Sequence, residues 1–219
     1  MSLFESNYEM KIPFNDLDPM NIVWHGNYIK YMETYYHGTS ILFKEFDLAH
    51  VLEGDGKVKF GYGVYVTSKY RTAAHYAGAN PTATTFYVYT VEIPEEKEDN
   101  YIAFKQPVHP HIIQKTEAKL GISVPGKMMA DGKDFRKWLA KKLTGIVDIT
   151  GEKAASEFLD SIGVDYIVWP YNWKNPEAGT NRAILNDKKV KVIRIDQVEL
   201  DKKKKQLVEG SEKNIPFTF

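Results

Sequence analysis

Strand-like and helix-like segments follow one another along this chain without strict alternation, and this order constrains the fold more than any other feature. The clearest strand is predicted over residues 84–93, which are rich in aromatic and β-branched side chains. Its alternation places Phe86 and Val88 on one face and Tyr87 on the other. Further strands are predicted at residues 8–14, 63–67, 164–169, 181–185 and 189–195, and helices at 27–36, at 70–77 and twice in the middle of the chain. Such an order favours an α+β fold over a doubly wound sheet.

Caps and apolar stripes predict the two helices of the middle region. Asp134 is predicted to cap the first helix, whose stripe consists of Phe135, Trp138, Leu139 and Leu143. Thr150 is predicted to cap the second helix, which ends at Gly163. The last two strands are predicted to pair with each other through a turn at Asn186 and Asp187.

Composition excludes several classes of site and partner. The chain has no cysteine, so disulfides, cysteine nucleophiles and thiolate metal ligands are excluded, which fits a reducing compartment. Its 29 acidic and 29 basic residues give a formal net charge of zero, so the overall charge favours neither nucleic acid nor membrane. No apolar run could span a bilayer, and residues 1–14 lack the pattern of a signal peptide. We therefore expect a cytoplasmic protein without a membrane partner, with a basic, solvated C-terminal tail over residues 201–219.

Three separated segments combine histidine, glycine and tyrosine. They are YHGTS at residues 36–40, GYGVYVTSKYRTAAHYA at 61–77 and GTNRAIL at 179–185. Each segment alone has an ordinary structural explanation, because glycines mark tight turns and tyrosines at helical spacing usually pack. Together the segments resemble the ADP-ribosyltransferase superfamily, in its diphtheria-toxin and poly(ADP-ribose)-polymerase branch and its phage- and toxin-associated bacterial type.

The resemblance depends on the spacing of one histidine and two tyrosines. That branch carries H-G-T/S on one strand, G-x-G-I/V-Y-F/V-T/A on the next, and a second tyrosine about eleven residues later. Here His37 begins HGTS, Tyr65 lies in GYGVYVT, and Tyr76 follows eleven residues after Tyr65. The resemblance covers residues 36–200 and implies two small β-sheets, with helices, around an NAD cleft.

The resemblance also implies a role for each matching residue. Tyr65 and Tyr76 would hold the nicotinamide ring, since flat tyrosine faces suit an electron-poor ring. His37 would bond a ribose hydroxyl of the adenosine half, and the backbone of Gly38 would meet the nicotinamide amide, where a side chain would block it. The remaining matching positions that would line the NAD site are Thr39 and Thr72. No metal ion is expected.

The chain departs from the family on the late strand, where a glutamate is usual. Asn181 and Arg182 occupy this region, and Glu177, in the preceding loop, is an alternative source of the carboxylate. Cleavage of the glycosidic bond of NAD passes through an oxocarbenium-like state, which a carboxylate stabilises better than a neutral amide does. We therefore expect Asn181 to act with His37 and Tyr65 in transferring single ADP-ribose units from NAD. The expected acceptor is a protein, with a nucleic acid or a small molecule as the alternatives. A catalytically inactive domain that binds NAD or ADP-ribose is the alternative.

The first residues resemble a different family. PFNDLDPMNIVWHGNYIKYMET at residues 13–34 is similar to the opening of hotdog-fold acyl-CoA thioesterases, with Asp18 at the catalytic carboxylate and His25 and Asn27 at the start of the central helix. The signal stops near residue 35, before the sheet that a hotdog fold needs. We therefore expect residues 1–35 to be a thioesterase-like fragment, residues 36–200 the ADP-ribosyltransferase-like domain, and residues 201–219 the tail. Thioesterase activity through Asp18 is a second alternative.

Overall fold

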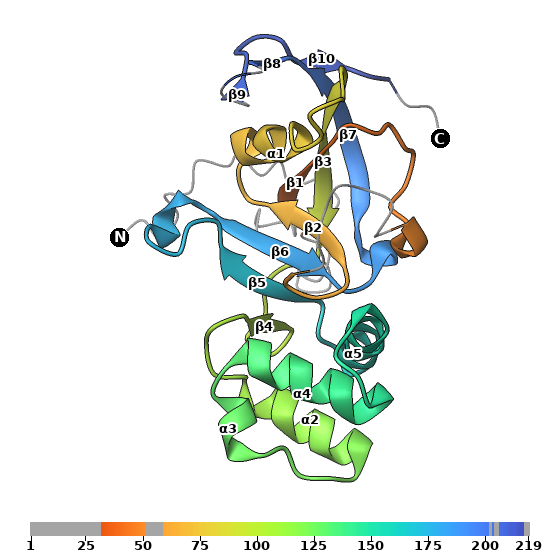
Figure 1. Ribbon diagram of the computed structural model, residues 1–219, viewed down its shortest axis with the longest axis vertical. Coiled ribbons are helices and arrows are strands. Elements are labelled where there is room, and N and C mark those ends of the chain that lie inside the picture. The colour runs from red at the N-terminus through yellow and green to blue at the C-terminus, as the bar shows by residue number, and fades with distance from the viewer. Residues whose placement is uncertain (1–31, 51–58, 202, 204–205, 217–219) are drawn as a thin grey trace, which may run out of the picture. The chain divides into compact units, whose positions relative to one another are not determined.

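The computed structural model describes residues 32–50, 59–201, 203 and 206–216 (Figure 1). Internal contacts divide the chain into two units, Met1–Met32 and Glu33–Phe219, and the fold below is that of the second. The strand predicted at residues 8–14 lies outside the described residues, as do Asp18, His25 and Asn27.

One eight-stranded sheet forms the centre of this unit, in the order β10-β7-β3-β1-β2-β6-β5-β4. Its strands are β1 (Glu33–Thr39), β2 (Val64–Thr67), β3 (Phe86–Ile93), β4 (Tyr101–Ala103), β5 (Tyr166–Pro170), β6 (Thr180–Ile184), β7 (Lys191–Val198) and β10 (Lys213–Asn214). All neighbouring strands are antiparallel except β4 and β5. Sheet and helices together confirm the α+β prediction.

The sheet consists of two four-stranded halves that scarcely pair with each other. β1 pairs with β3 at seven positions, from Glu33↔Ile93 to Thr39↔Tyr87, but with β2 only at Tyr36↔Thr67. The expected pair of small sheets is therefore a single sheet with a weak join between β1 and β2. A separate two-stranded sheet, β8 (Leu200–Asp201) with β9 (Gln206–Leu207), follows β7.

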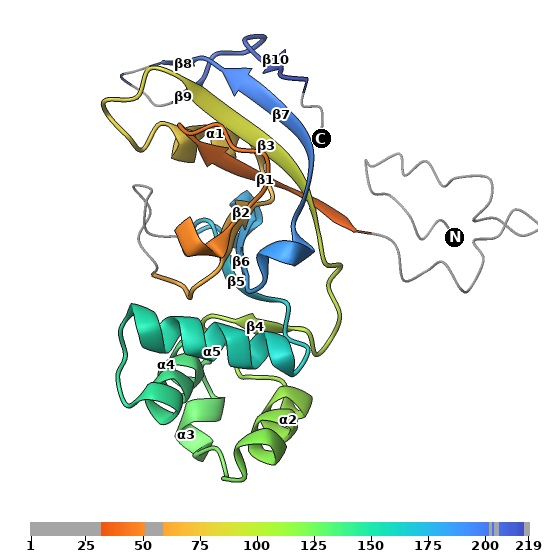
Figure 2. The same cartoon turned by 90° about the vertical axis from the view of Figure 1, so that its right-hand side faces the viewer.

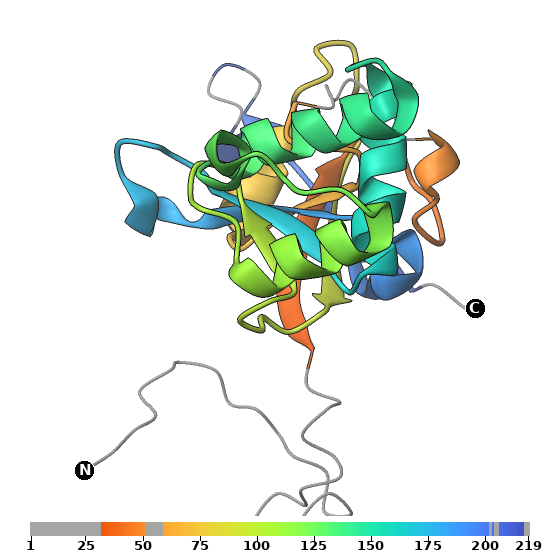
Figure 3. The same ribbon diagram turned by 90° about the horizontal axis from the view of Figure 1, so that it is seen from below.

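Helices cover the two halves separately. α1 (Tyr70–Ala77) packs against β1 and β3, where its alanines meet Phe86 and Val88. The other helices are α2 (Pro110–Leu120), α3 (Gly126–Met129), α4 (Gly132–Thr144) and α5 (Ile149–Ser161), with short 3-10 turns η3 (Leu48–His50), η4 (Pro176–Ala178) and η5 (Asp187–Lys189) elsewhere. These four α-helices gather at the end of the sheet that carries β4 (Figures 1, 2 and 3).

Three apolar clusters hold these layers together. One cluster lies between the α2–α5 helices and β4–β6, and includes Phe135, Leu159 and Ile167. A second lies on the other side of the sheet and includes Tyr89 and Ile184, and the third joins α1 to β3 and β7. None of the helices in the described part of the chain is long and apolar enough to cross a membrane.

The structure corrects several local predictions. The predicted helix at residues 27–36 is wrong over Glu33–Tyr36, which belong to β1 because β3 offers this aromatic and β-branched segment a full ladder partner. The helix caps lie further upstream than predicted. The Asp131 carboxylate accepts from the backbone N–H groups of Lys133 and Asp134, and the Asp148 carboxylate accepts from Gly151.

The pairing of the last strands also differs from the prediction. β6 pairs with β2 and β5, whereas β7 pairs with β3 and β10, so the turn at Asn186 and Asp187 connects strands from different halves of the sheet. The segment 201–219 was expected to be a solvated tail, yet it contributes β9 and the edge strand β10. Period-two patterns identify strands but not their partners.

Candidate functional site

The register of β2, β6 and β5 decides which of the predicted site residues share a face. Tyr65 pairs with Ala183, while Thr67 and Trp169 both pair with Asn181. Directly paired residues of antiparallel strands project to the same side. One face of the sheet therefore carries Tyr65, Thr67, Trp169 and Asn181. On the neighbouring strand β1, α1 packs against this same face.

Asn181 is buried and incompletely bonded. Its side chain is 4% exposed, and its Nδ2 donates to the Tyr76 hydroxyl over 3.4 Å, which is long for a hydrogen bond. Its Oδ1 has no hydrogen-bond partner, although buried polar atoms are normally paired. Asn181 therefore presents a desolvated acceptor beside a residue, Tyr76, that the sequence also assigned to the site.

Arg182 lies on the opposite face of the sheet. Its guanidinium bonds Glu96 at 2.9 Å and lies 3.1 Å from the Glu33 carboxylate. The rings of Tyr35 and Tyr166 lie 4.6 and 4.2 Å from it. This buried arrangement is structural. Of the two candidates that the resemblance gave for the glutamate position, only Asn181 lies on the face of Tyr65 and Tyr76.

Tyr65 is held by its own loop. Its hydroxyl accepts from the Phe60 N–H and donates to the Gly61 carbonyl, each at 2.9 Å, and burial raises its pKa to about 12. Its ring packs edge-on against Trp169, with 5.4 Å between centroids. The Tyr65 side chain is thus uncharged and held in one position. Among the described residues, its ring makes no contact with the Tyr76 ring.

Tyr76 and Thr72 lie one turn apart on α1. Spacing of four places both on the same helix face, where Thr72 is buried and Tyr76 is 44% exposed. The Tyr76 ring also meets Tyr171 edge-on at 6.2 Å, and its pKa is raised by burial. The Tyr76 hydroxyl therefore lies next to Asn181, while part of the side chain faces solvent.

His37 lies where the pairing of β1 and β2 stops. Its Nδ1 is 2.7 Å from the Tyr65 carbonyl oxygen, which can only accept, so Nδ1 carries the proton. Burial lowers the pKa of His37 and favours the neutral ring. The ring lies among aromatic side chains, and its centroid is 5.1 Å from that of Phe46. The remaining nitrogen, Nε2, is then an acceptor. Its neighbour Gly38 lies against α1, on the same face of the sheet as Asn181, so the His37 side chain points to the opposite face. The His37 ring bonds the backbone carbonyl of Tyr65 and makes no bond with Asn181.

Gly38 and Thr39 have structural roles that the sequence did not suggest. A Cβ at Gly38 would overlap the carbonyl oxygen of Ala73, so this glycine lets α1 lie directly on β1. Thr39 Oγ1 accepts from the Ile41 N–H at 3.1 Å and closes the turn after β1. Beyond Tyr36, β1 pairs only with β3 in the described residues. The β1 backbone at Gly38 therefore has no strand partner on the side where β2 would continue.

Three aromatic or polar residues beside the site were not predicted. Thr67, Trp169 and Tyr171 each lie next to a predicted residue, but they come from strands whose alignment the sequence does not show. Glu177, by contrast, is exposed on η4, and no bond joins it to the site. In the segments that the structure describes, no group of histidine and carboxylate residues is arranged to hold a metal ion.

Comparison of the chain with models of known protein families, with curated proteins and with solved structures found no match.

Proposed function

We propose that this chain binds NAD where the two halves of the sheet separate, and transfers ADP-ribose to a macromolecule with release of nicotinamide. The proposal brings together the resemblance of three sequence segments and the arrangement of the same segments in space. HGTS lies on β1, GYGVYVT on β2, and the two strands part after one residue pair, as expected of two small sheets around a ligand. An ADP-ribosyltransferase fold is therefore part of the proposal.

The observation that carries the proposal is the unpaired Oδ1 of Asn181. A buried acceptor without a donor costs about 1–3 kcal/mol, which a ligand hydroxyl would offset by donating to it. The weak 3.4 Å bond between Asn181 and Tyr76 is easily exchanged for a ligand contact. The nicotinamide-side ribose of NAD carries hydroxyls that suit this acceptor.

Two further groups fit other parts of NAD. On the other face of the sheet, where the two halves part, the Nε2 of neutral His37 can accept from a hydroxyl of the adenosine ribose. The free edge of β1 at Gly38 offers backbone groups to the nicotinamide amide, in place of the missing β2 partner. Tyr65 and Tyr76 supply uncharged aromatic surface near Asn181 for the nicotinamide ring.

The proposed reaction needs no redox change. The glycosidic C–N bond breaks, nicotinamide leaves with the bonding electrons, and an acceptor nucleophile bonds the ribose carbon and loses its proton to solvent. Asn181 can orient the ribose but cannot neutralise the developing positive charge. Slow transfer of single ADP-ribose units is therefore the activity that we propose.

The direct test uses NAD labelled in its adenylate part, mixed with the protein and a cell lysate. Nicotinamide release and labelled macromolecules are both expected, and Asn181→Ala should lower release about tenfold, the value of one hydrogen bond in the transition state. Asn80→Ala, which alters only a surface turn, is the matched control. Binding of NAD without nicotinamide release would instead support the inactive NAD-binding alternative.

A further inference from the structure

In the part of the chain that the structure describes, the largely exposed aromatic side chains lie at the candidate site and on the loop that follows β5. Among the described residues, the aromatic side chains that are largely exposed are Tyr76, Tyr171 and Trp173, at 44%, 39% and 43%. The other large exposed apolar side chains are aliphatic or methionine. Tyr76 bonds Asn181 and meets Tyr171, and Trp173 lies two positions after Tyr171 in the chain. These three residues are here called the aromatic rim. Exposed aromatic rings beside a candidate site favour a binding surface.

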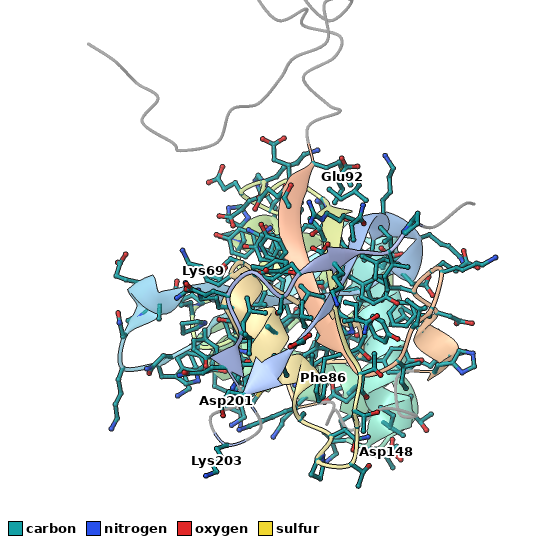
Figure 4. The ribbon with its side chains drawn as sticks, turned by 90° about the horizontal axis from the view of Figure 1, so that it is seen from above. Lys69, Phe86, Glu92, Asp148, Asp201 and Lys203 are labelled. Carbon is teal, nitrogen blue, oxygen red and sulfur yellow. The ribbon has the colours of Figure 1, made fainter. Side chains whose placement is uncertain are left out.

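Lysines accompany the aromatic rim. Lys105 Nζ lies 4.4 Å from the Trp173 ring, and Lys174 follows Trp173 in the chain. On the other side, Lys69 precedes α1 (Figure 4), and its side chain lies beside Gly179, whose carbonyl accepts from the Tyr171 N–H. The described residues show no ion pair for any of these lysines.

The local charge thus differs from the overall balance. The chain has no net charge, yet between residues 171 and 179 the only acid is Glu177, and Lys69, Lys105 and Lys174 are exposed and unneutralised. A fourth lysine, Lys59, lies 5.5 Å from the Phe60 ring, which packs against the same Phe104 that meets Trp173. Unpaired lysines around flat rings complement a ligand that combines flat bases with negative charge.

We propose that the aromatic rim and its lysines bind single-stranded nucleic acid, which is the acceptor for the ADP-ribosyl transfer proposed above. This inference rests on the proposed function, and it replaces the expectation of a protein acceptor. Unpaired bases expose the faces that Tyr171 and Trp173 can stack upon, whereas a duplex hides them. Phosphates fit the lysines, and an acidic peptide lacks the flat surface that would use the rings.

The test is fluorescence anisotropy of the full chain with a labelled twelve-nucleotide single strand, as DNA and as RNA. Expected results are binding at least about tenfold tighter than to the duplex of the same sequence, and tenfold weaker binding by Trp173→Ala. Lys105→Ala should reduce the slope of log affinity against log salt by about 0.7. Lys141→Ala, an exposed lysine on α4, is the control and should change neither.

Four outcomes overturn the proposal: no binding of either single strand, equal binding of the duplex, displacement by polyglutamate at the same charge concentration, or an unchanged affinity of Trp173→Ala. Circular dichroism of the variant shows whether it is folded. Nicotinamide release without any acceptor is measured separately. If release is absent while the strand still binds at the aromatic rim, the proposed transfer and the acceptor role of the strand both fail, and only the binding surface stands.

Discussion

At the scale of single residues, the structure separates two neighbours that the sequence could not separate. Asn181 and Arg182 are adjacent, yet Asn181 faces Tyr76 and Arg182 is enclosed by two carboxylates and two tyrosine rings. Successive residues of a strand point to opposite faces, so only Asn181 lies on the same face as Tyr65 and Tyr76. This assignment makes the missing glutamate testable at one position.

Asn181→Glu is expected to raise nicotinamide release about a hundredfold, because a carboxylate would stabilise the oxocarbenium-like state where the amide cannot. The measurement is the initial rate of nicotinamide release at saturating NAD. The control is Arg182→Glu, which places a third carboxylate near Glu33 and Glu96 and removes their cation. It should lower the unfolding free energy by about 3 kcal/mol or more without raising the rate. A faster rate in Arg182→Glu and not in Asn181→Glu would contradict the assignment.

His37 makes stability depend on pH. Burial lowers its pKa in the folded chain from the usual 6.5. The contribution of neutral His37 to the unfolding free energy is therefore fully present above pH 6.5. As pH falls below that value and through the lower folded pKa, the unfolded chain binds a proton that the folded chain does not, and the unfolding free energy decreases. His37→Phe lacks this group. Urea unfolding at pH 7.5 and 5.5 should show a smaller pH-dependent loss in His37→Phe than in wild type; equal losses would contradict the burial of a neutral His37.

At the scale of elements, the placement of α1 decides the geometry of the site. The helix lies close to β1 because Gly38 has no side chain, and its buried face is built from alanines. This close approach brings Tyr76, near the end of α1, onto Asn181 of β6. Gly38 is therefore needed for the packing of α1 on β1, whereas the resemblance implied only a contact of this glycine with the ligand.

Gly38→Ala should displace α1, because the new methyl group overlaps the backbone of Ala73 and a helix carbonyl cannot move alone. We expect a loss of about 1–3 kcal/mol in unfolding free energy, together with weaker NAD binding. Guanidinium unfolding and titration calorimetry measure the two effects. Gly126→Ala, where an added methyl group meets nothing within 4 Å, should be nearly neutral. Unchanged stability of Gly38→Ala would show that α1 does not depend on this contact.

At the scale of the whole molecule, Glu33–Phe219 has its own core. Its two half-sheets meet at the pair Tyr36↔Thr67, with added bonds from His37 to the Tyr65 carbonyl and from Tyr35 to Thr180. The three apolar clusters consist of residues from this unit. A unit with its own core should fold and act independently of the segment that resembles a thioesterase.

Removal of residues 1–31 is therefore expected to leave the unfolding midpoint and the rate of nicotinamide release unchanged, because the ion pair of Glu33 and the three core clusters of the described residues remain. In the full chain, Asp18→Ala should likewise have no effect on release, and neither chain should hydrolyse an acyl-CoA. Thermal unfolding, nicotinamide release and a thiol assay with acyl-CoA check the three statements. Acyl-CoA hydrolysis that Asp18→Ala abolishes would support the thioesterase alternative.

The sequence by itself determined the local elements of this protein. Period-two aromatic and β-branched runs located β2, β3, β5, β6 and β7, and an apolar stripe located α4, since these signals depend on neighbours along the chain. The same patterns mistook Glu33–Tyr36 for a helix, because a short aromatic segment fits both periods until a ladder partner is present.

Only the tertiary structure decided which strands pair and which side chains meet. It aligned Asn181 with Thr67 and Trp169, removed Arg182 from the site, and brought Tyr171 to Tyr76. The physical reason is that strand order and register depend on contacts between residues more than a hundred positions apart, such as Tyr76 with Asn181, and no local pattern encodes such contacts.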